Sequence, residues 1–253
     1  MLHLVYFSPT HTGQTAARAL AEGIGGEVVE HDLTLKPARD GFALSCGADD
    51  VLVFAFPVYA GRVPAALAPV LDALEGQQTP CIPVAVYGNR DFDDALAEAA
   101  ALLEAKGFQT VGACAFIGEH SFTRKVATDR PDEADKACAV EFGRQIAERL
   151  AQGAPFERPA FKGNVPTEPA HGMPFRPVTS DACVACGACV AACPMSNISA
   201  DDPTLAGDAC IVCNACVKAC PQGAKSFDAE PLMGIIGFLE GNCAARKEPE
   251  LFI

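Results

Sequence analysis

Two runs of cysteines mark the last third of this 253-residue chain. Each run has the spacing C-x2-C-x2-C-x3-C-P, and together they hold eight of the thirteen cysteines. Three thiolates at such short intervals can hold one corner of an iron-sulfur cube, while the fourth iron takes a thiolate from elsewhere. The spacing therefore predicts 4Fe-4S clusters. The expected metal ligands are Cys183, Cys186, Cys189 and Cys193 in the first run and Cys210, Cys213, Cys216 and Cys220 in the second.

A zinc site is the alternative for these cysteines, because paired C-x2-C knuckles also supply four thiolates in a tetrahedral arrangement. Zinc sites, however, seldom use three cysteines at consecutive x2 intervals followed by x3 and proline, and they seldom repeat that pattern. Iron-sulfur clusters are therefore the favoured interpretation. The five scattered cysteines are expected to be buried as small apolar residues. They are Cys46, Cys81, Cys114, Cys138 and Cys243.

The two cysteine runs belong to an internal duplication with a period of 27 residues. The segment DACVACGACVAACPMSNIS at 181–199 aligns with DACIVCNACVKACPQGAKS at 208–226, and eleven of nineteen positions are identical. Both copies keep four cysteines, so the duplication predicts two clusters. Because their surroundings are so alike in sequence, we expect them to have similar reduction potentials.

A second candidate site is the Ser/Thr-rich loop SPTHTGQT at 8–15, which follows the first apolar run of the chain. Its hydroxyls, with the backbone N–H groups at the start of a helix, could hold a phosphate. Gly13 would let the backbone close on such a group. The alternative is an ordinary helix N-cap, for which serine and threonine are preferred residues.

The first half of the chain alternates short β-branched or aromatic runs with alanine-rich stretches, which is typical of a parallel sheet with crossover helices. Strands are expected at 2–7, 27–31, 51–56, 82–87 and 110–117, and helices at 14–24, 64–74, 93–106 and 131–152. In a doubly wound sheet with flavodoxin-like order, a ligand binds at the carboxyl ends of the strands, between the first and third strands. The loops FPVYAGRVP at 56–64 and YGNRDFDD at 87–94 follow the third and fourth strands and could hold a flat ring.

Residues 178–228 resemble the bacterial two-cluster ferredoxins, and residues 1–152 look like a flavodoxin-type FMN domain. The whole chain thus resembles bacterial flavodoxin-ferredoxin fusion proteins. This resemblance implies an α/β fold, a flavodoxin-like doubly wound parallel five-stranded sheet, followed by a small α+β ferredoxin-like domain with two 4Fe-4S clusters. It also implies that the fourth cysteine of each run binds the cluster of the other run. One cluster would then have Cys183, Cys186, Cys189 and Cys220 as ligands, and the other Cys210, Cys213, Cys216 and Cys193.

The same resemblance implies FMN as the ligand of the first domain. Around its phosphate we expect Ser8, Thr10, His11, Thr12, Gly13, Gln14 and Thr15. Around its isoalloxazine ring we expect Pro57, Tyr59, Ala60, Gly61, Tyr87, Gly88, Asn89 and Arg90. The segment GEHSF at 118–122 follows the fifth strand and is a candidate to close the site. The chain has no tryptophan, so aromatic contact with the ring falls to tyrosine. His11 is expected to donate its amide rather than shuttle protons, and the role of His120 is open.

We expect four parts: an FMN-binding domain at 1–152, a proline-rich linker at 153–177, a two-cluster domain at 178–230 and a C-terminal tail at 231–253 that packs on the body. Six prolines in the linker favour an extended, semi-stiff connection. The apolar stretch at 231–240 is expected to cover one of the two domains, and docking of a partner is the alternative.

Charge and composition limit the location and the partners. The net charge of −13 disfavours nucleic acid and anionic lipid as partners. No signal-peptide pattern opens the chain, and the apolar stretch at 231–239 is far shorter than the roughly 20 residues of a membrane span. Many cysteines without an export signal are typical of a reducing compartment, so we expect the cytoplasm, in an anaerobic or otherwise reducing cell. A redox partner is expected to present a basic docking face, unless the acidic surface serves only solubility.

These features favour an electron-transfer protein that relays single electrons between the two clusters and FMN, joining one-electron and two-electron redox partners. One alternative is an FMN-dependent reductase of a small molecule that receives electrons through the clusters. Another is a redox sensor or scaffold. The sequence has no obvious G-x-G-x-x-G fingerprint, which disfavours direct NADH oxidation. It also has no clear acid-base pair, which disfavours a substrate-specific enzyme.

Overall fold

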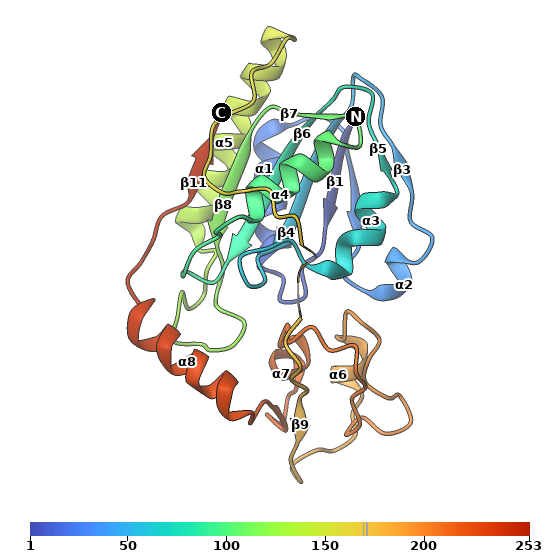
Figure 1. The fold of residues 1–253 in the computed structure, drawn as a ribbon, viewed down its shortest axis with the longest axis vertical. Helices are drawn as coiled ribbons and strands as arrows, with labels where there is room; N and C mark the ends of the chain where they lie inside the picture. The colour runs from blue at the N-terminus through green and yellow to red at the C-terminus, as the bar shows by residue number, and fades with distance from the viewer. Residues whose placement is uncertain (169, 171) are drawn as a thin grey trace.

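The computed structural model describes all residues of the chain except 169 and 171. A larger α/β body is formed by the first half of the chain, and a smaller unit lies at one end of it (Figure 1). The smaller unit faces the ends at which the parallel strands of the body finish. The two units are therefore stacked end to end.

Five parallel strands form the centre of the body. Their order across the sheet is β2 (Val28–Asp32), β1 (Leu2–Tyr6), β4 (Val51–Pro57), β6 (Thr79–Tyr87) and β8 (Ala113–Ile117). The chain first moves outward from β1 to β2 and then returns to the other side of β1, so the order reverses between β1 and β4. This is the doubly wound, flavodoxin-like arrangement, and the predicted fold class is confirmed.

Two short strands extend the sheet beyond the five that were predicted. β7 (Phe108–Thr110) pairs with the first part of β6, and β8 pairs with its last part, so the single strand expected at 110–117 is divided in two. β11 (Glu250–Phe252) pairs antiparallel with β8, with Leu251 opposite Cys114. A separate parallel pair is formed by β3 (Leu44–Ser45) and β5 (Leu74–Glu75).

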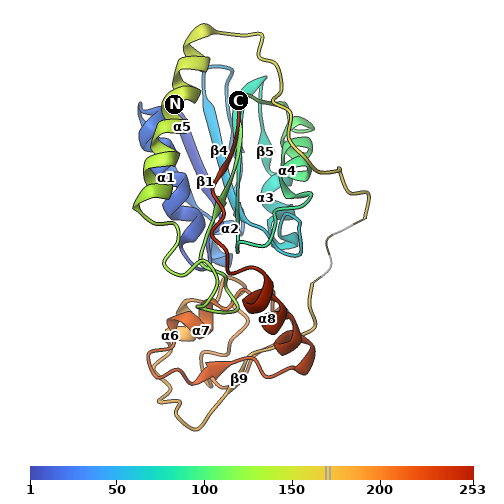
Figure 2. The same cartoon turned by 90° about the vertical axis from the view of Figure 1, so that its left-hand side faces the viewer.

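Helices cover both faces of the sheet, as Figure 2 shows. One face carries α1 (Thr12–Ile24) and α5 (Glu133–Gln152), and the other carries the 3-10 turn Ala65–Leu67, α3 (Ala68–Asp72) and α4 (Ala95–Glu104); α2 (Lys36–Arg39) follows β2. The backbones of α1 and α5 are in close contact, because a Cβ atom on Gly23 would lie 2.0 Å from the carbonyl oxygen of Val140. Cover on both faces explains why β1 and the middle of β4 are buried at successive positions rather than alternating ones.

The scattered cysteines lie in or near the two cores of the body. Cys46, Cys81 and Cys114 are buried, as expected, whereas Cys138 and Cys243 are partly buried. Burial raises the pKa of Cys46 to about 11 and that of Cys81 to about 12. These two thiols are therefore protonated and unreactive at neutral pH.

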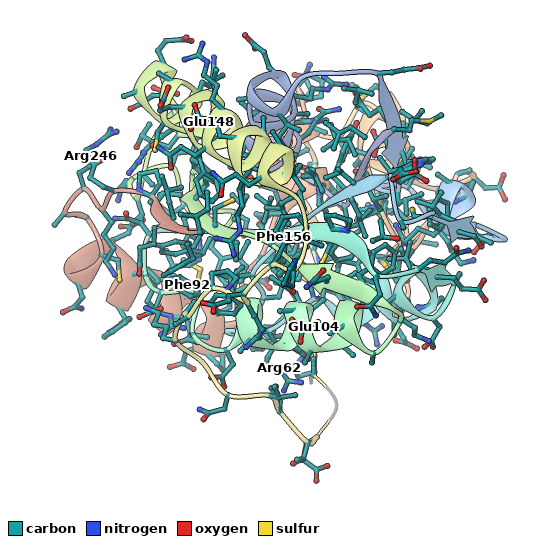
Figure 3. The ribbon with its side chains drawn as sticks, turned by 90° about the horizontal axis from the view of Figure 1, so that it is seen from above. Arg62, Phe92, Glu104, Glu148, Phe156 and Arg246 are labelled. Atoms are coloured by element: carbon teal, nitrogen blue, oxygen red, sulfur yellow. The ribbon has the colours of Figure 1, made fainter. Side chains whose placement is uncertain are left out.

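The segment 153–177 leaves α5 and runs past α4 towards the smaller unit (Figure 2). None of its described residues lies in a helix or strand, and residues 169 and 171, which the predicted linker includes, lie outside the described residues. The segment is attached to the body: Arg158 donates to Glu104 over 2.8 Å, and the carbonyl oxygen of Phe156 accepts from Gln109 over 3.1 Å. Glu104 and Phe156 are labelled in Figure 3.

The smaller unit contains β9 (Val178–Thr179), α6 (Ala188–Ala191), α7 (Ala215–Ala219) and β10 (Lys225–Ser226). Its two halves follow the duplication in the sequence. β9 and β10 are antiparallel and place Thr179 opposite Lys225, and an isolated bridge places Ala206 opposite Ile198. Each residue of one pair is 27 positions from a residue of the other, so the two pairs are duplicates of each other.

The C-terminal segment contacts both units. α8 (Glu230–Asn242) lies beside the smaller unit, and its Glu240 accepts from the Thr123 hydroxyl over 2.6 Å and from Lys125 over 2.9 Å. The chain then returns to the body and ends as β11. The sequence predicted a tail that packs on the body but not a strand. No helix among the described residues combines the length and the apolar character needed to cross a membrane.

Candidate cofactor sites

The eight cysteines of the duplicated runs surround two separate hollows in the smaller unit. The first hollow is lined by Cys183, Cys186, Cys189 and Cys220, and the second hollow is lined by Cys193, Cys210, Cys213 and Cys216. Each hollow thus combines the first three cysteines of one run with the fourth cysteine of the other. These are the two sets that the resemblance implied. No group of three or more possible ligands among the described residues could hold a single metal ion, whereas a four-iron cube takes one thiolate at each iron.

Backbone amides point at the cysteine sulfurs in a way that repeats with the duplication. Asn197 donates its amide to the sulfur of Cys193 over 3.3 Å, and the equivalent Ala224 donates to Cys220 over 3.2 Å. Burial acts to raise the pKa of Cys220, but several amides, with that of Ala224 first, lower it more. Such amides stabilise a thiolate, whether free or bound to iron.

A residue in the left-handed backbone conformation precedes each of the two short helices of the smaller unit. Gly187 and Asn214 precede α6 and α7 with φ values of 76° and 61°, and they occupy equivalent positions in the two repeats.

Burial raises the pKa of Cys213 and of Cys216 to about 12, so both thiols hold protons until a metal displaces them.

The Ser/Thr-rich loop lines a cavity of about 400 Å³ at the start of α1. Four of the seven residues predicted around a phosphate line it, namely Thr10, His11, Thr12 and Thr15. The first amides of α1 have no intrahelical acceptor, so this end of the helix favours an anion. Hydroxyls and a helix N-terminus are a donor set that fits a phosphate.

The other three predicted residues shape the loop. The Ser8 hydroxyl accepts from the amide of Gln14 over 3.0 Å, and the Ser8 amide donates to the hydroxyl of Thr34 over 3.0 Å. The Gln14 side chain donates to the Tyr6 hydroxyl over 2.6 Å and so points away from the cavity. A Cβ atom on Gly13 would lie 3.3 Å from the Ser8 oxygen, which is a tight contact.

Two cationic side chains that sequence reasoning missed also line the phosphate-side cavity. Arg130 forms a buried ion pair with Asp135. Lys218, from the second cysteine run, lies 2.6 Å from Glu119 of the body. Burial acts to raise the pKa of Glu119, but Lys218, the amide of Asp129 and the charge of Arg124 together lower it more, so this ion pair between the units is formed at neutral pH. The wall of the cavity therefore contains one cation from each unit, together with the carboxylates of Glu119 and Asp129.

A second cavity, of about 230 Å³, lies where the loops after β4, β6 and β8 meet the smaller unit. Six of the eight residues predicted around the ring line it, namely Tyr59, Ala60, Gly61, Tyr87, Gly88 and Arg90. Pro57 and Asn89 do not. The Asn89 side chain donates to the carbonyl oxygens of Cys243 and Ala245 over 2.6 and 2.7 Å, so it holds the C-terminal segment.

His120 closes the ring-side cavity from the loop after β8. A Cβ atom on Gly88 would lie 2.3 Å from its ring, so only glycine permits this approach. Burial, and then the charges of Lys218 and Arg90, lower the pKa of His120 to about 4. Its Nδ1 accepts from the amide of Phe122 over 3.1 Å, which leaves the proton of the neutral ring on Nε2. His120 is thus a neutral N–H donor beside the cavity.

The two cavities and the second hollow lie next to one another. Glu119 lines the phosphate-side cavity, and the next residue, His120, lines the ring-side cavity. Ile211 lines both the ring-side cavity and the second hollow. Burial raises the pKa of the ring-side Tyr59 well above its usual value, and the charges of Cys213 and Cys210, which line the second hollow, act in the same direction.

The ring-side cavity is covered by segments far along the chain. Ile235, Phe238 and Leu239 of α8 line it, as does Met173 of the segment 153–177. In the sequence, the apolar stretch at 231–240 was the feature that predicted such a cover.

Comparison with known proteins assigns the smaller unit. Residues 182–225 match the family described as a 4Fe-4S dicluster domain. A search of curated proteins gave no match. Among solved structures, the Streptococcus pneumoniae TIGR4 flavodoxin is 16% identical, with a TM-score of 0.40 over 60% of this chain and 99% of the flavodoxin. Megasphaera elsdenii flavodoxin is 18% identical, with a TM-score of 0.42 over 58% of this chain and 99% of that chain. An azoreductase from Bacillus anthracis is 15% identical, with a TM-score of 0.38 over 58% and 98% of the two chains.

The observed strand order and the dicluster match agree with the resemblance predicted from the sequence. The chain combines a flavodoxin-like body with a 4Fe-4S ferredoxin-type unit.

Proposed function

We propose that this flavodoxin-like and ferredoxin-like chain relays single electrons between two 4Fe-4S clusters and an FMN, and so joins one-electron and two-electron redox partners. The single observation that carries the proposal is the shared wall at Ile211, which lies between the second hollow and the ring-side cavity. A cluster and a flavin bound in these two places would be neighbours, with no further residue layer needed to connect them.

The cysteines of the two hollows are the proposed cluster ligands, and the body with its loops is the proposed flavin domain. Thr10, Thr12 and Thr15 would hold the phosphate by their hydroxyls, with the amides at the start of α1 and the charge of Lys218. FMN, when bound, supplies a group that accepts one or two electrons. Tyr59 and Tyr87 lie where they can contact the ring, and His120 would donate its Nε2 proton to a ring heteroatom.

The first hollow is the proposed place where electrons enter or leave. Cys186 is exposed there, and the neighbouring Val184 has 63% of its surface exposed. An apolar, accessible wall beside a cluster suits a short-lived contact with another redox protein. Given the net charge of −13, that protein would present a basic face, and we place both proteins in a reducing cytoplasm.

The proposal is tested by anaerobic purification, cofactor analysis and rapid mixing. About eight iron and eight sulfide per chain and one FMN are expected. After mixing with a low-potential one-electron donor, the clusters should be reduced first. The flavin should follow with a first-order rate that is independent of protein concentration, because the transfer occurs within one chain.

Three results would count against this function. Stoichiometric zinc with little iron would remove the clusters. A flavin phase whose rate rises with protein concentration would show that electrons cross between molecules. Sustained turnover of a small molecule by the reduced chain, with no acceptor protein present, would favour the alternative of an FMN-dependent reductase.

A further inference from the structure

Lys225 is a buried cation in the wall of the first hollow. It lines that hollow together with the four cysteines, and only 3% of its surface is exposed. Its Nζ donates to the Thr179 hydroxyl over 2.7 Å and to the Pro203 carbonyl oxygen over 2.6 Å. Both partners are neutral. Burying an ammonium group with neutral partners alone is unfavourable, so the site points to a nearby negative charge.

The charge of Lys225 acts on the carboxylate of Asp202, which lies at the surface and is partly exposed. The hydroxyl and amide of Thr204 lower the pKa of Asp202, and the charge of Lys225 contributes less. A carboxylate at the surface offsets little of the cost of burying a cation. A cluster held by four thiolates is an anion, and one in the first hollow would lie directly against Lys225.

The duplication provides an internal comparison for this position. The residue 27 positions before Lys225 is Ile198, which is also buried and lines the second hollow. Their pairing partners are equivalent too: Lys225 lies opposite Thr179, and Ile198 lies opposite Ala206. The same backbone arrangement thus occurs twice. At the second hollow it holds the apolar pair Ile198 and Ala206, and at the first hollow it holds the cation Lys225 and the hydroxyl of Thr179 that accepts from it.

We propose that Lys225 raises the reduction potential of the first cluster above that of the second, so that the two clusters of the duplication are not equivalent. This inference rests on the proposed function, because it requires clusters in both hollows. Reduction adds one electron to a cluster without changing its ligands. A buried cation beside the cluster stabilises the more negative, reduced state, and net charge nearby is one of the factors that set the potentials of iron-sulfur clusters.

No cation is among the described residues that line the second hollow, although the charges of Arg176 and Lys225 reach its Cys210 and Cys216 from outside. Arg39 also approaches this hollow, from the side of the body. Its guanidinium donates to the carbonyl oxygen of Pro194 over 2.6 Å, and Pro194 and Met195 form the wall there. A residue layer therefore separates this charge from the second hollow, whereas no layer separates Lys225 from the first hollow. We therefore expect the first cluster to have the higher reduction potential, in place of the similar reduction potentials that the sequence alone predicts.

The order has a functional consequence. The first electron would occupy the outer, first cluster. A second electron would then occupy the second cluster, beside the ring-side cavity. The chain would hold one electron away from the flavin and deliver to it once both clusters are reduced, which suits a two-electron acceptor.

The test uses the whole chain with its cofactors and the apolar pair that the duplication already contains. Lys225→Ile with Thr179→Ala reproduces at the first hollow the pair Ile198 and Ala206. Lys225→Arg keeps the charge. Anaerobic redox titration monitored by EPR should place the first reduction step of the double variant at lower potential, by at least a tenfold change in its equilibrium constant, which is about 59 mV for one electron. The Lys225→Arg chain should stay close to the native value.

The reciprocal variant, Ile198→Lys with Ala206→Thr, places the cation at the second hollow. It should raise the second reduction step and leave the first step nearly unchanged. If the Lys225→Ile double variant loses iron, the reciprocal variant decides the question. Unchanged steps in chains that retain eight iron would overturn the role of Lys225 and leave the proposed function intact. Absence of iron from the native chain would instead overturn the proposed function.

Discussion

Replacing Arg39 with methionine is expected to loosen the contact between the body and the smaller unit. Arg39 is buried, with 8% of its surface exposed, and its guanidinium lies 5.0 Å from the centre of the Phe7 ring. It donates to the carbonyl oxygens of Leu33 over 2.8 Å and Thr34 over 2.6 Å within the body, and to that of Pro194 over 2.6 Å in the smaller unit. This one side chain therefore connects α2 and the residues that follow β2 to Pro194, the residue after a proposed cluster ligand.

The size of the effect follows from these three hydrogen bonds. A hydrogen bond from a charged group contributes about 1.5–3 kcal/mol. Of these three bonds only the one to Pro194 crosses between the units, and a longer bond from the same guanidinium reaches the Met195 sulfur over 3.5 Å. The free energy of docking should therefore fall by about 2 kcal/mol, which is roughly 30-fold in the docking equilibrium. The other two bonds should lower the stability of the body by a similar order.

Hydrogen exchange of the backbone amides at 193–198 measures this docking directly. In the Arg39→Met chain these amides should exchange roughly 30-fold faster, because exchange follows the population of the open state. Arg39→Lys keeps the charge but loses the forked geometry, so an intermediate effect is expected. Cluster reduction potentials measured in the same samples show whether the substitution changes the driving force for electron transfer as well as the docking of the two units. Native exchange at 193–198 in a folded Arg39→Met chain would refute the reasoning.

Three further predictions concern the cofactor sites. The double variant Cys183→Ala, Cys220→Ala should keep about four iron per chain, because both residues line the first hollow; loss of all iron would show that each run binds its own cluster. The double variant Thr12→Ala, Thr15→Ala should raise the Kd of FMN and leave the iron content unchanged, and an unaltered Kd would contradict the phosphate site. His120 has a folded pKa of about 4 against an unfolded value near 6.5, so the unfolded state binds the extra proton between these values and stability falls as pH drops through that window. The loss should approach about 3 kcal/mol by pH 4, and a His120→Phe chain should lack this component in urea titrations.

The sheet order could be predicted because local signals determine its strands, and the cysteines that line each hollow agree with the sets that the resemblance implied. Strands such as β4 and β6 are continuous apolar runs, which only a sheet covered on both faces explains. The cysteine spacing predicts 4Fe-4S clusters, and the match to a 4Fe-4S dicluster domain agrees with it. Strand β11 was not predictable in the same way. It is three residues long, and its pairing with β8 depends on the path of everything between 118 and 249.

The candidate flavin site was predictable only in outline. Most predicted residues line the two cavities, because loops at the carboxyl ends of neighbouring strands must meet. The exceptions depend on tertiary contacts: Asn89 turns to the C-terminal segment, and Gln14 turns to Tyr6. Two cations of the smaller unit had a signal in the sequence. Lys218 and Lys225 stand where the other repeat has Ala191 and Ile198, and an exchange of an apolar residue for a charged one within a duplication indicates a difference between its halves.

The position of β11 has a consequence for biosynthesis. A ribosome makes the five parallel strands first, then the cysteine runs, and only then residues 250–252, so the free edge of β8 has no partner during all of that time. An unpaired strand edge is a template for association with another chain. The nascent chain therefore exposes this edge until residues 250–252 have been made.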